Sequence, residues 1–196
     1  MLEPRTWRVA VIGGGVGRNH IGRGYRRHPD KFRVQAVCDV DTARLAAVGE
    51  EFSIPRRTWS FDEVLRMDDV DIVDICTPAA LHFGQILAAL AAGKEVVCEK
   101  PLVGSLAEID QVITAEKAAA GRVMPIFQYR FGNGVQKAKL IIDSGMVGKP
   151  VRLAEQGAIS GDERRYGRGD RAIRTSAVLT VCQSIPGWPG AASSAG

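Results

Sequence analysis

The sequence has no long apolar run, few histidines and no closely spaced cysteines. No apolar stretch among its 196 residues approaches the roughly 18 needed to span a bilayer, so we expect no membrane partner. The four cysteines show no C-x-x-C spacing, which argues against a zinc site and a disulfide framework. The amino terminus, MLEPRTWR, lacks the apolar core of a secretory signal. These absences predict a cytoplasmic protein in which Cys38, Cys76 and Cys98 are small buried hydrophobic residues.

The low aromatic content and the scattered charges exclude a further class of partner. The net charge is only +4, and aromatic residues make up 6% of the chain. Basic pairs such as Arg26-Arg27, Arg56-Arg57 and Arg164-Arg165 are far apart and have no aromatic residues interleaved with them. Surfaces that bind nucleic acids cluster their basic residues, so we expect no nucleic-acid partner.

What the sequence does contain is a regular alternation of two patterns. Over the first 128 residues, short apolar runs rich in β-branched residues alternate with helical patterns. Strands are expected at residues 7–12, 32–38, 70–76, 95–98 and 123–127. Near-continuous apolar strands separated by helices predict an α/β fold, a Rossmann-like doubly wound parallel sheet with helices on both faces. Ligands of such sheets bind at the carboxyl ends of the strands.

Capping residues mark several helix ends. Ser60 with Glu63, and Ser105 with Glu108, have the S-x-x-E spacing of a capping box. Gly93 closes the helix that precedes the fourth of the five expected strands, because glycine readily adopts the left-handed conformation of a helix end.

We expect three parts along the chain. Residues 1–128 would form the α/β domain. Residues 129–160 contain a helix expected from about 135 to 144 and then a strand, the start of an incomplete α/β carboxyl-terminal domain. Residues 161–196 are rich in Arg, Gly, Ser and Pro and have little periodicity beyond AVLTVC, which predicts an irregular tail.

The stretch VIGGGVGRNH, residues 11–20, follows the first strand and opens a helix. Its spacing is G-x-G-x-G, one residue shorter than the G-x-G-x-x-G of dinucleotide-binding turns. We interpret three glycines as the tight-turn, phosphate-approach and packing positions, in the order Gly13, Gly15 and Gly17. The helix after Gly17 would direct backbone N–H groups at a pyrophosphate, and Arg18 could add charge there. His20 is equally compatible with a plain position on the helix surface.

Asp39 ends the second strand, where the ribose-binding carboxylate of such a domain belongs. A carboxylate accepts hydrogen bonds from ribose hydroxyls and repels a 2′-phosphate, so Asp39 favours NAD over NADP. The alternative is a solvated aspartate in a turn. The strand–turn–helix context of the preceding glycines favours the cofactor interpretation.

Three segments together resemble a known family: VAVIGGGVGRNH, DIVDICTPAALHFGQILAALAAGKEVVCEKPL and FQYRF…KAKLIIDSGMVGKP. They are similar to the Gfo/Idh/MocA family of NAD(P)-dependent oxidoreductases over roughly the first 155 residues. The resemblance implies an amino-terminal Rossmann domain and a carboxyl-terminal α/β domain that holds the substrate and often mediates homo-oligomer formation. It also implies hydride transfer between nicotinamide and a carbon of a sugar, inositol or related polyol.

The resemblance assigns site residues as well. Lys100 matches the lysine of the family's EKP motif and is the expected catalytic residue, able to hydrogen-bond a reacting hydroxyl and stabilise developing negative charge. The alternative for E-K-P is an ordinary surface turn. His82 either contacts the cofactor or is a polar residue on an amphipathic helix. We expect no metal site, and the expected cofactor contacts are Gly13, Gly15, Val16, Gly17, Asp39, Thr77, Pro78, His82, Glu99 and Lys100.

The family's second catalytic element, an Asp and a His a few residues apart, has no counterpart here. The histidines of the sequence are His20, His28 and His82, all in the first half. Two explanations for the missing element are open: a reading-frame shift near residue 161, or a naturally short paralogue. Either one predicts a sugar or polyol dehydrogenase with an intact cofactor domain, an incomplete substrate domain and weak or no activity. The alternative is a non-catalytic NAD(P)-binding or sensing module.

Overall fold

The computed structural model describes residues 5–148, 152–157 and 177–182. The chain divides into two units, residues 1–127 and residues 128–196.

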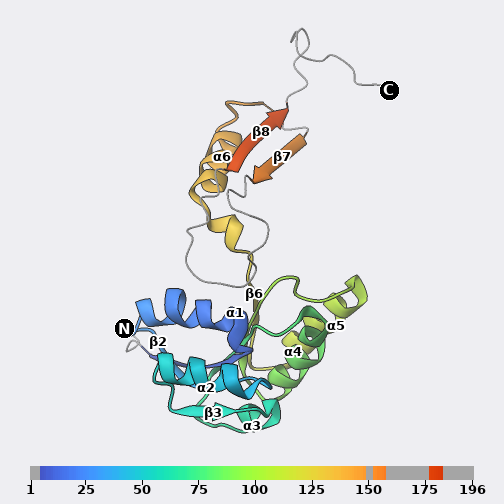
Figure 1. The fold of residues 1–196 in the computed structure, drawn as a ribbon. Helices are drawn as coiled ribbons and strands as arrows, with labels where there is room; N and C mark the ends of the chain where they lie inside the picture. Colours follow the sequence, from blue (N-terminus) through green and yellow to red (C-terminus); the bar gives the residue numbers. More distant parts are fainter. Residues whose placement is uncertain (1–4, 149–151, 158–176, 183–196) are drawn as a thin grey trace, which may run out of the picture. The chain divides into compact units, whose positions relative to one another are not determined.

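A six-stranded parallel sheet forms the centre of the first unit (Figure 1). Its order is β3-β2-β1-β4-β5-β6, so the chain crosses from one edge back to the middle between β3 and β4. The strands are β1 (Trp7–Ile12), β2 (Phe32–Cys38), β3 (Arg56–Thr58), β4 (Ile72–Ile75), β5 (Glu95–Cys98) and β6 (Val123–Pro125). The prediction of a doubly wound α/β sheet is confirmed, and β3 is a strand that the sequence pattern did not reveal.

Helices cover both faces of this sheet. They are α1 (Gly14–Asn19), which continues as a π-helical turn His20–Gly24 and a 3-10 turn Tyr25–Arg27, then α2 (Thr42–Glu51), α3 (Phe61–Leu65), α4 (His82–Ala91) and α5 (Leu106–Ala118). Along β1, Val9 and Val11 face the cluster that contains α2, whereas Ala10 and Ile12 face the cluster of α3, α4 and α5. Both faces of β1 are therefore buried, which explains why its sequence is a continuous apolar run.

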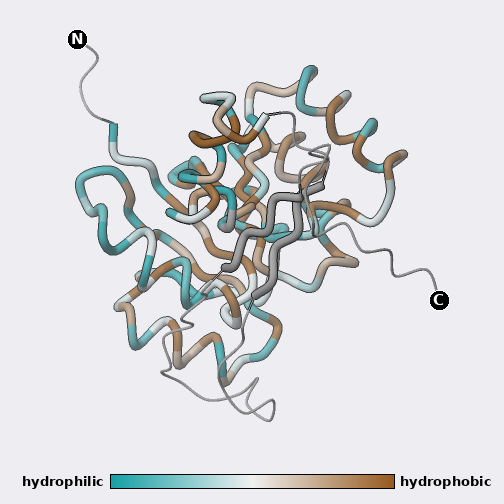
Figure 2. Tube along the Cα trace, turned by 90° about the horizontal axis from the view of Figure 1, so that it is seen from above, coloured by the Kyte–Doolittle hydropathy of each residue, from teal (hydrophilic) through white to brown (hydrophobic). Residues whose placement is uncertain are grey.

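Hydrophobic and hydrophilic residues alternate along the helical segments, as the colouring in Figure 2 shows. In α4, for example, Ile86, Ala89 and Leu90 are buried, at the three- and four-residue spacing of one helix face. Burial of a side chain such as Ile86 stabilises the folded state by roughly 1.5–3 kcal/mol relative to leaving it exposed. Among the described helices, none has both the length and the apolar character that crossing a bilayer requires.

The two predicted capping boxes differ in the structure. At α5, the Ser105 hydroxyl accepts from the Glu108 backbone N–H, and the Glu108 carboxylate accepts from the Ser105 N–H, so the box is complete. At α3, Ser60 caps the Glu63 N–H, but the Glu63 carboxylate binds the Thr58 hydroxyl instead. The Thr58 oxygen already accepts from the Ser60 N–H at 3.0 Å, which leaves no backbone donor for the second half of the box.

The cysteine prediction is confirmed for the three cysteines of the first unit, which are buried and free. Burial raises the pKa of Cys38 to about 11 and that of Cys98 to about 12, so both thiols stay protonated at neutral pH.

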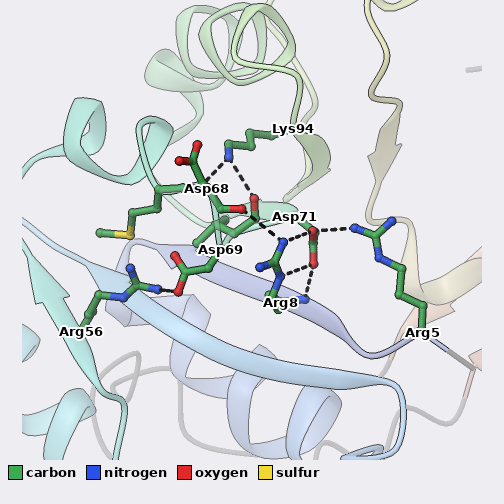
Figure 3. Close-up of polar contacts among 9 residues, drawn as sticks. Arg5, Arg8, Arg56, Asp68, Asp69, Asp71 and Lys94 are labelled. Atoms are coloured by element: carbon green, nitrogen blue, oxygen red, sulfur yellow. Dashed lines mark hydrogen bonds and ion pairs between the residues drawn. The ribbon is translucent and has the colours of Figure 1, made fainter.

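An ion-pair cluster lies at the amino ends of the strands (Figure 3). The Asp71 carboxylate, just before β4, accepts from the backbone N–H and guanidinium of Arg8 and from Arg5, at 2.6–2.9 Å. These bonds outweigh the effect of burial and hold the pKa of Asp71 well below its usual range. The buried Lys94 ammonium donates to the backbone carbonyls of Met67 and Val70, at 2.7 and 2.9 Å. We call Arg5, Arg8, Asp71 and Lys94 the amino-end cluster.

The second unit contains a 3-10 turn (Gln128–Phe131), the helix α6 (Asn133–Asp143) and a two-stranded antiparallel sheet of β7 (Arg152–Gly157) and β8 (Ala177–Cys182). The helix begins two residues before the predicted start at residue 135. β8 lies inside the segment for which composition predicts an irregular tail, and the other residues of that segment, 161–176 and 183–196, are outside the described residues.

Candidate active site at the carboxyl ends of the strands

The fold brings the predicted site residues of the first unit to the carboxyl-terminal ends of the strands. The glycine turn follows β1, Asp39 follows β2, Thr77 lies just beyond β4, and Glu99 and Lys100 follow β5. All of these strands are parallel, so their carboxyl ends lie together.

The glycine turn is sharper than its spacing predicts. Gly13 adopts φ +92°, and a Cβ there would lie 2.7 Å from the Cys76 carbonyl oxygen, so only glycine fits. The predicted helix start after Gly17 is wrong: α1 begins at Gly14 because the positive φ of Gly13 has already turned the chain. Gly17 packs against the Val11 side chain, while no atom lies within 4 Å of the Cβ position of Gly15. The turn is thus closed by protein atoms at Gly13 and Gly17 and open at Gly15.

Asp39 is a buried acceptor and not a solvated turn residue. It is 6% exposed, and its carboxylate accepts from the backbone N–H of Gly14 at 2.7 Å and of Asp41 at 2.9 Å. Arg44 adds a two-pronged ion pair at 2.7 and 3.1 Å. Burial opposes ionisation of Asp39, but these bonds prevail and lower its pKa.

A shallow depression lies beside Asp39 between α1 and α2. It is lined by Gly14, Gly15, Arg18, Arg44, Ala47, Val48 and Glu51. Arg18 makes a 2.6 Å ion pair with Glu51 across it. Val16, on the same turn, is half exposed. Of the predicted positions around the glycine turn, Gly15 and Val16 are exposed, whereas Gly17 is buried.

His82 has a role that neither sequence interpretation described. Its ring is 1% exposed, and its two nitrogens lie 2.8 Å from the carbonyl oxygens of Thr77 and Pro101. The ring therefore bridges the turn after β4 to the turn after β5, and both of its nitrogens face protein atoms. Thr77 and Pro78 are at least partly exposed on the first of these turns.

Lys100 is exposed on the turn after β5, and its backbone is held by its neighbour. The Lys100 N–H donates to Glu99 Oε2 at 3.0 Å. The other oxygen, Glu99 Oε1, lies 3.1 Å from His20 Nε2. Glu99 thus connects the candidate catalytic lysine to the helical segment that follows the glycine turn.

A buried polar network continues from this point and was missed at the sequence level. His20 Nδ1 lies 2.9 Å from Oδ2 of Asp74, a fully buried residue within β4. The Tyr25 hydroxyl donates to the same oxygen at 3.0 Å, and the Cys76 thiol lies 3.5 Å from Asp74 Oδ1. We call His20, Tyr25, Asp74, Cys76 and Glu99 the carboxyl-end cluster. The available signal was Asp74 itself, because a carboxylate in an apolar strand requires buried partners.

This network shifts the titration of its members. Burial alone would lower the pKa of His20, but hydrogen bonds and charges from Asp74 and Glu99 outweigh it and raise that pKa. Burial and the Asp74 charge raise the pKa of Tyr25 and of Cys76 far above their usual ranges. Donor atoms of His20, Asp74 and Cys76 lie within 4.8 Å of one another. Hydrogen bonds among these groups account for that spacing, and we assign no metal to it.

Comparison with known proteins identifies the family. Residues 7–127 match the profile described as oxidoreductase family, NAD-binding Rossmann fold, of the Gfo/Idh/MocA group. The chain belongs to this family. The resemblance drawn from the sequence motifs is therefore confirmed, and the Gfo/Idh/MocA match ends where the first unit ends.

The proteins that this chain resembles include inositol 2-dehydrogenases. That of Salmonella typhimurium is 32% identical over 151 residues, covering 76% of this chain and 45% of the relative. Inositol 2-dehydrogenase 3 of Saccharopolyspora erythraea is 35% identical over 149 residues, covering 74% and 43%. The chain spans less than half the length of the curated relatives that it matches.

Solved structures of similar proteins agree with the fold. The WlbA dehydrogenase from Bordetella pertussis, in complex with NADH and UDP-GlcNAcA, superposes with a TM-score of 0.71 at 26% identity, over 76% of this chain and 45% of that one. The scyllo-inositol dehydrogenase from Lactobacillus casei, with NAD(H) and scyllo-inositol, gives 0.68 at 25% identity, over 76% and 44%.

Proposed function

We propose that this chain binds NAD at the carboxyl edge of its sheet and contributes the cofactor half of a dehydrogenase acting on a CH–OH group of a sugar, inositol or related polyol. The observation that carries the proposal is the convergence of the Gly13–Gly15 turn, Asp39 and Lys100 on one edge of the sheet of an NAD-binding Rossmann fold. A relative named inositol 2-dehydrogenase and a similar structure in complex with NADH and UDP-GlcNAcA support the substrate class.

Asp39 supports the choice of NAD over NADP. Its lowered pKa keeps the carboxylate charged at neutral pH, and a charged carboxylate accepts from ribose hydroxyls and repels a 2′-phosphate. Its acceptor sites are now occupied by Arg44 and two backbone N–H groups. The Arg44 side chain is 44% exposed, so it can move aside when ribose hydroxyls take over its bonds.

In this proposal some of the expected cofactor contacts line the cofactor, and others hold the turns around it in place. Gly13, Gly15, Val16 and Gly17 shape the turn for the pyrophosphate, and Thr77 and Pro78 line the nicotinamide-ribose side. Glu99 and His82 position the turns around the site, since both are engaged with protein atoms.

Lys100 carries the chemistry that this chain supplies. A bound NAD would supply the acceptor for the hydride that leaves the alcohol carbon. The exposed Lys100 side chain would hydrogen-bond the reacting hydroxyl and stabilise the negative charge that develops on its oxygen as the hydroxyl proton passes to water at this exposed position. In this proposal residues 129–160 begin the substrate domain, which would also mediate homo-oligomer formation.

A second candidate function has its own supporting observation. All three histidines lie in residues 1–127, so the second unit supplies no histidine as a proton-transfer partner. This favours a chain that binds NAD without turning over a substrate by itself, as a binding or sensing module.

Turnover with the Lys100→Ala variant separates the two candidates. We expect oxidation of inositol or a sugar, followed as NADH absorbance, to fall by roughly 10²–10⁴-fold while NAD binding is retained. Lys117→Ala, on the exposed face of α5, is the matched control and should change neither quantity. NAD binding with no turnover by the unaltered chain would favour the module, and absence of binding would refute both candidates.

A further inference from the structure

The carboxyl-end cluster contains an imidazole placed between two carboxylates. His20 Nδ1 faces Asp74 at 2.9 Å and Nε2 faces Glu99 at 3.1 Å. Asp74 is fully buried, and the His20 side chain is 15% exposed. A neutral imidazole carries one N–H, whereas both partners here are acceptors. Both hydrogen bonds therefore form together only when both ring nitrogens carry a proton.

The contacts of His20 link three elements that are far apart in the sequence. His20 belongs to the helical segment after the glycine turn, Asp74 lies in β4, and Glu99 follows β5. Glu99 uses its second oxygen to accept the Lys100 N–H at 3.0 Å. The chain of bonds therefore runs from a buried aspartate through the imidazole to the backbone of the exposed lysine.

We propose that His20 is a positioning residue whose imidazolium form fixes Glu99, and through Glu99 the backbone of Lys100. A neutral ring can donate to only one of the two carboxylates. When its remaining N–H is on Nδ1, facing the fully buried Asp74, the hydrogen bond to Glu99 is lost. The Glu99 side chain, 13% exposed, then has a path to water and releases the Lys100 N–H. The consequence for catalysis rests on the proposed function of Lys100, but the bond itself does not.

The other groups around the ring favour the doubly protonated form. Tyr25 donates to Asp74 Oδ2, so this carboxylate is oriented toward the ring by a group that stays protonated. The Cys76 sulfur lies 3.2 Å from His20 Nδ1 and also stays protonated, since burial raises its pKa. Asp74 and Glu99 together raise the pKa of His20, in agreement with the geometry.

Nuclear magnetic resonance of the full chain, without cofactor, tests this proposal. The imidazole resonance of His20 and the backbone amide resonance of Lys100 are followed from pH 5 to pH 9. We expect His20 to titrate above the ordinary histidine midpoint of about 6.5, and the Lys100 amide to shift with the same midpoint. A Lys100 amide that stays unchanged while His20 titrates would overturn the proposal, as would a His20 midpoint at or below 6.5.

Two variants make the test specific. In His20→Gln the Lys100 amide should lose this pH-dependent shift, whereas His28→Gln, which alters an exposed histidine, should retain it. In Glu99→Gln the His20 midpoint should fall and the Lys100 amide should no longer follow it. If His20→Gln does not fold, the titration of the unaltered chain and of Glu99→Gln still decides the question. The readout uses neither NAD nor substrate, so its outcome is independent of the proposed function.

Discussion

The amino-end and carboxyl-end clusters lie at opposite ends of the same strands and use charge differently. In the amino-end cluster, Arg8 and Asp71 join neighbouring strands through a guanidinium that is charged at every physiological pH. In the carboxyl-end cluster, His20 joins β4 to the turn after β5 through a ring that can lose a proton near neutral pH. The first arrangement suits permanent support, and the second suits a turn whose position depends on protonation.

The largest effect on stability is expected from Asp71→Ala. It removes the acceptor shared by Arg5 and Arg8. The Arg8 N–H and both guanidinium groups lose these bonds, and the Arg8 guanidinium keeps only the Asp68 carbonyl. We expect the free energy of unfolding to fall by about 3 kcal/mol, by the same amount at pH 6 and at pH 9. Urea unfolding at both pH values measures it, with Asp110→Ala on the exposed face of α5 as the control. A loss that depends strongly on pH would remove the contrast between the clusters.

His20→Gln should show the opposite behaviour. Because folding raises the pKa of His20, the charged ring stabilises the folded chain fully below the unfolded value of about 6.5. That contribution is lost as the pH rises through the raised folded value. The variant should therefore lose about 2 kcal/mol of unfolding free energy at pH 6 and clearly less at pH 9. Equal losses at the two pH values in urea unfolding would contradict the account.

A smaller effect is expected from Lys94→Met at the amino end. The change removes the donor for the carbonyls of Met67 and Val70 but also removes a buried charge, so the two consequences partly cancel. We expect a loss of about 1 kcal/mol in the same urea measurements. A loss as large as that of Asp71→Ala would show that Lys94, and not Asp71, supports this end of the sheet.

Arg5→Ala should have the smallest effect. The Arg5 side chain is 62% exposed, and its ion pair with Asp71 is screened by water. We expect a change of no more than about 0.5 kcal/mol, and Asp71 keeps its bonds to Arg8 in this variant. Comparison of its urea midpoint with that of Asp71→Ala shows whether the stabilisation resides in the half-buried Arg8 pair.

Much of the fold could be predicted because its signals are local. The five predicted strands are present because each is an apolar run of strand length, and Ser105 with Glu108 forms its predicted box within four residues of chain. β3 was missed because it has only three residues, two of them arginines at a sheet edge. The half-formed box at Ser60 depends on Thr58, which becomes an acceptor only through the geometry of that edge.

The candidate site could be predicted only in part, for a related reason. Asp39 and Lys100 both follow parallel strands, so the topology alone places them at the same end of the sheet, where the strands end. His20 has partners 54 and 79 residues away, and nothing in its neighbourhood in the sequence distinguishes it from a surface histidine. The role of His82 was likewise hidden, because its partners are backbone carbonyls, which carry no sequence signature.

Whether the chain binds NAD through Asp39, in preference to NADP, is tested most directly by calorimetry. NAD and NADP are each titrated into the unaltered chain and into Asp39→Ala. We expect the unaltered chain to bind NAD more tightly than NADP, and Asp39→Ala to lose affinity for NAD and most of the preference. Asp41→Ala, which removes a neighbouring carboxylate that caps α2, should retain the preference. Equal affinities for the two cofactors, or a preference that survives in Asp39→Ala, would contradict the proposed role of Asp39 in NAD binding.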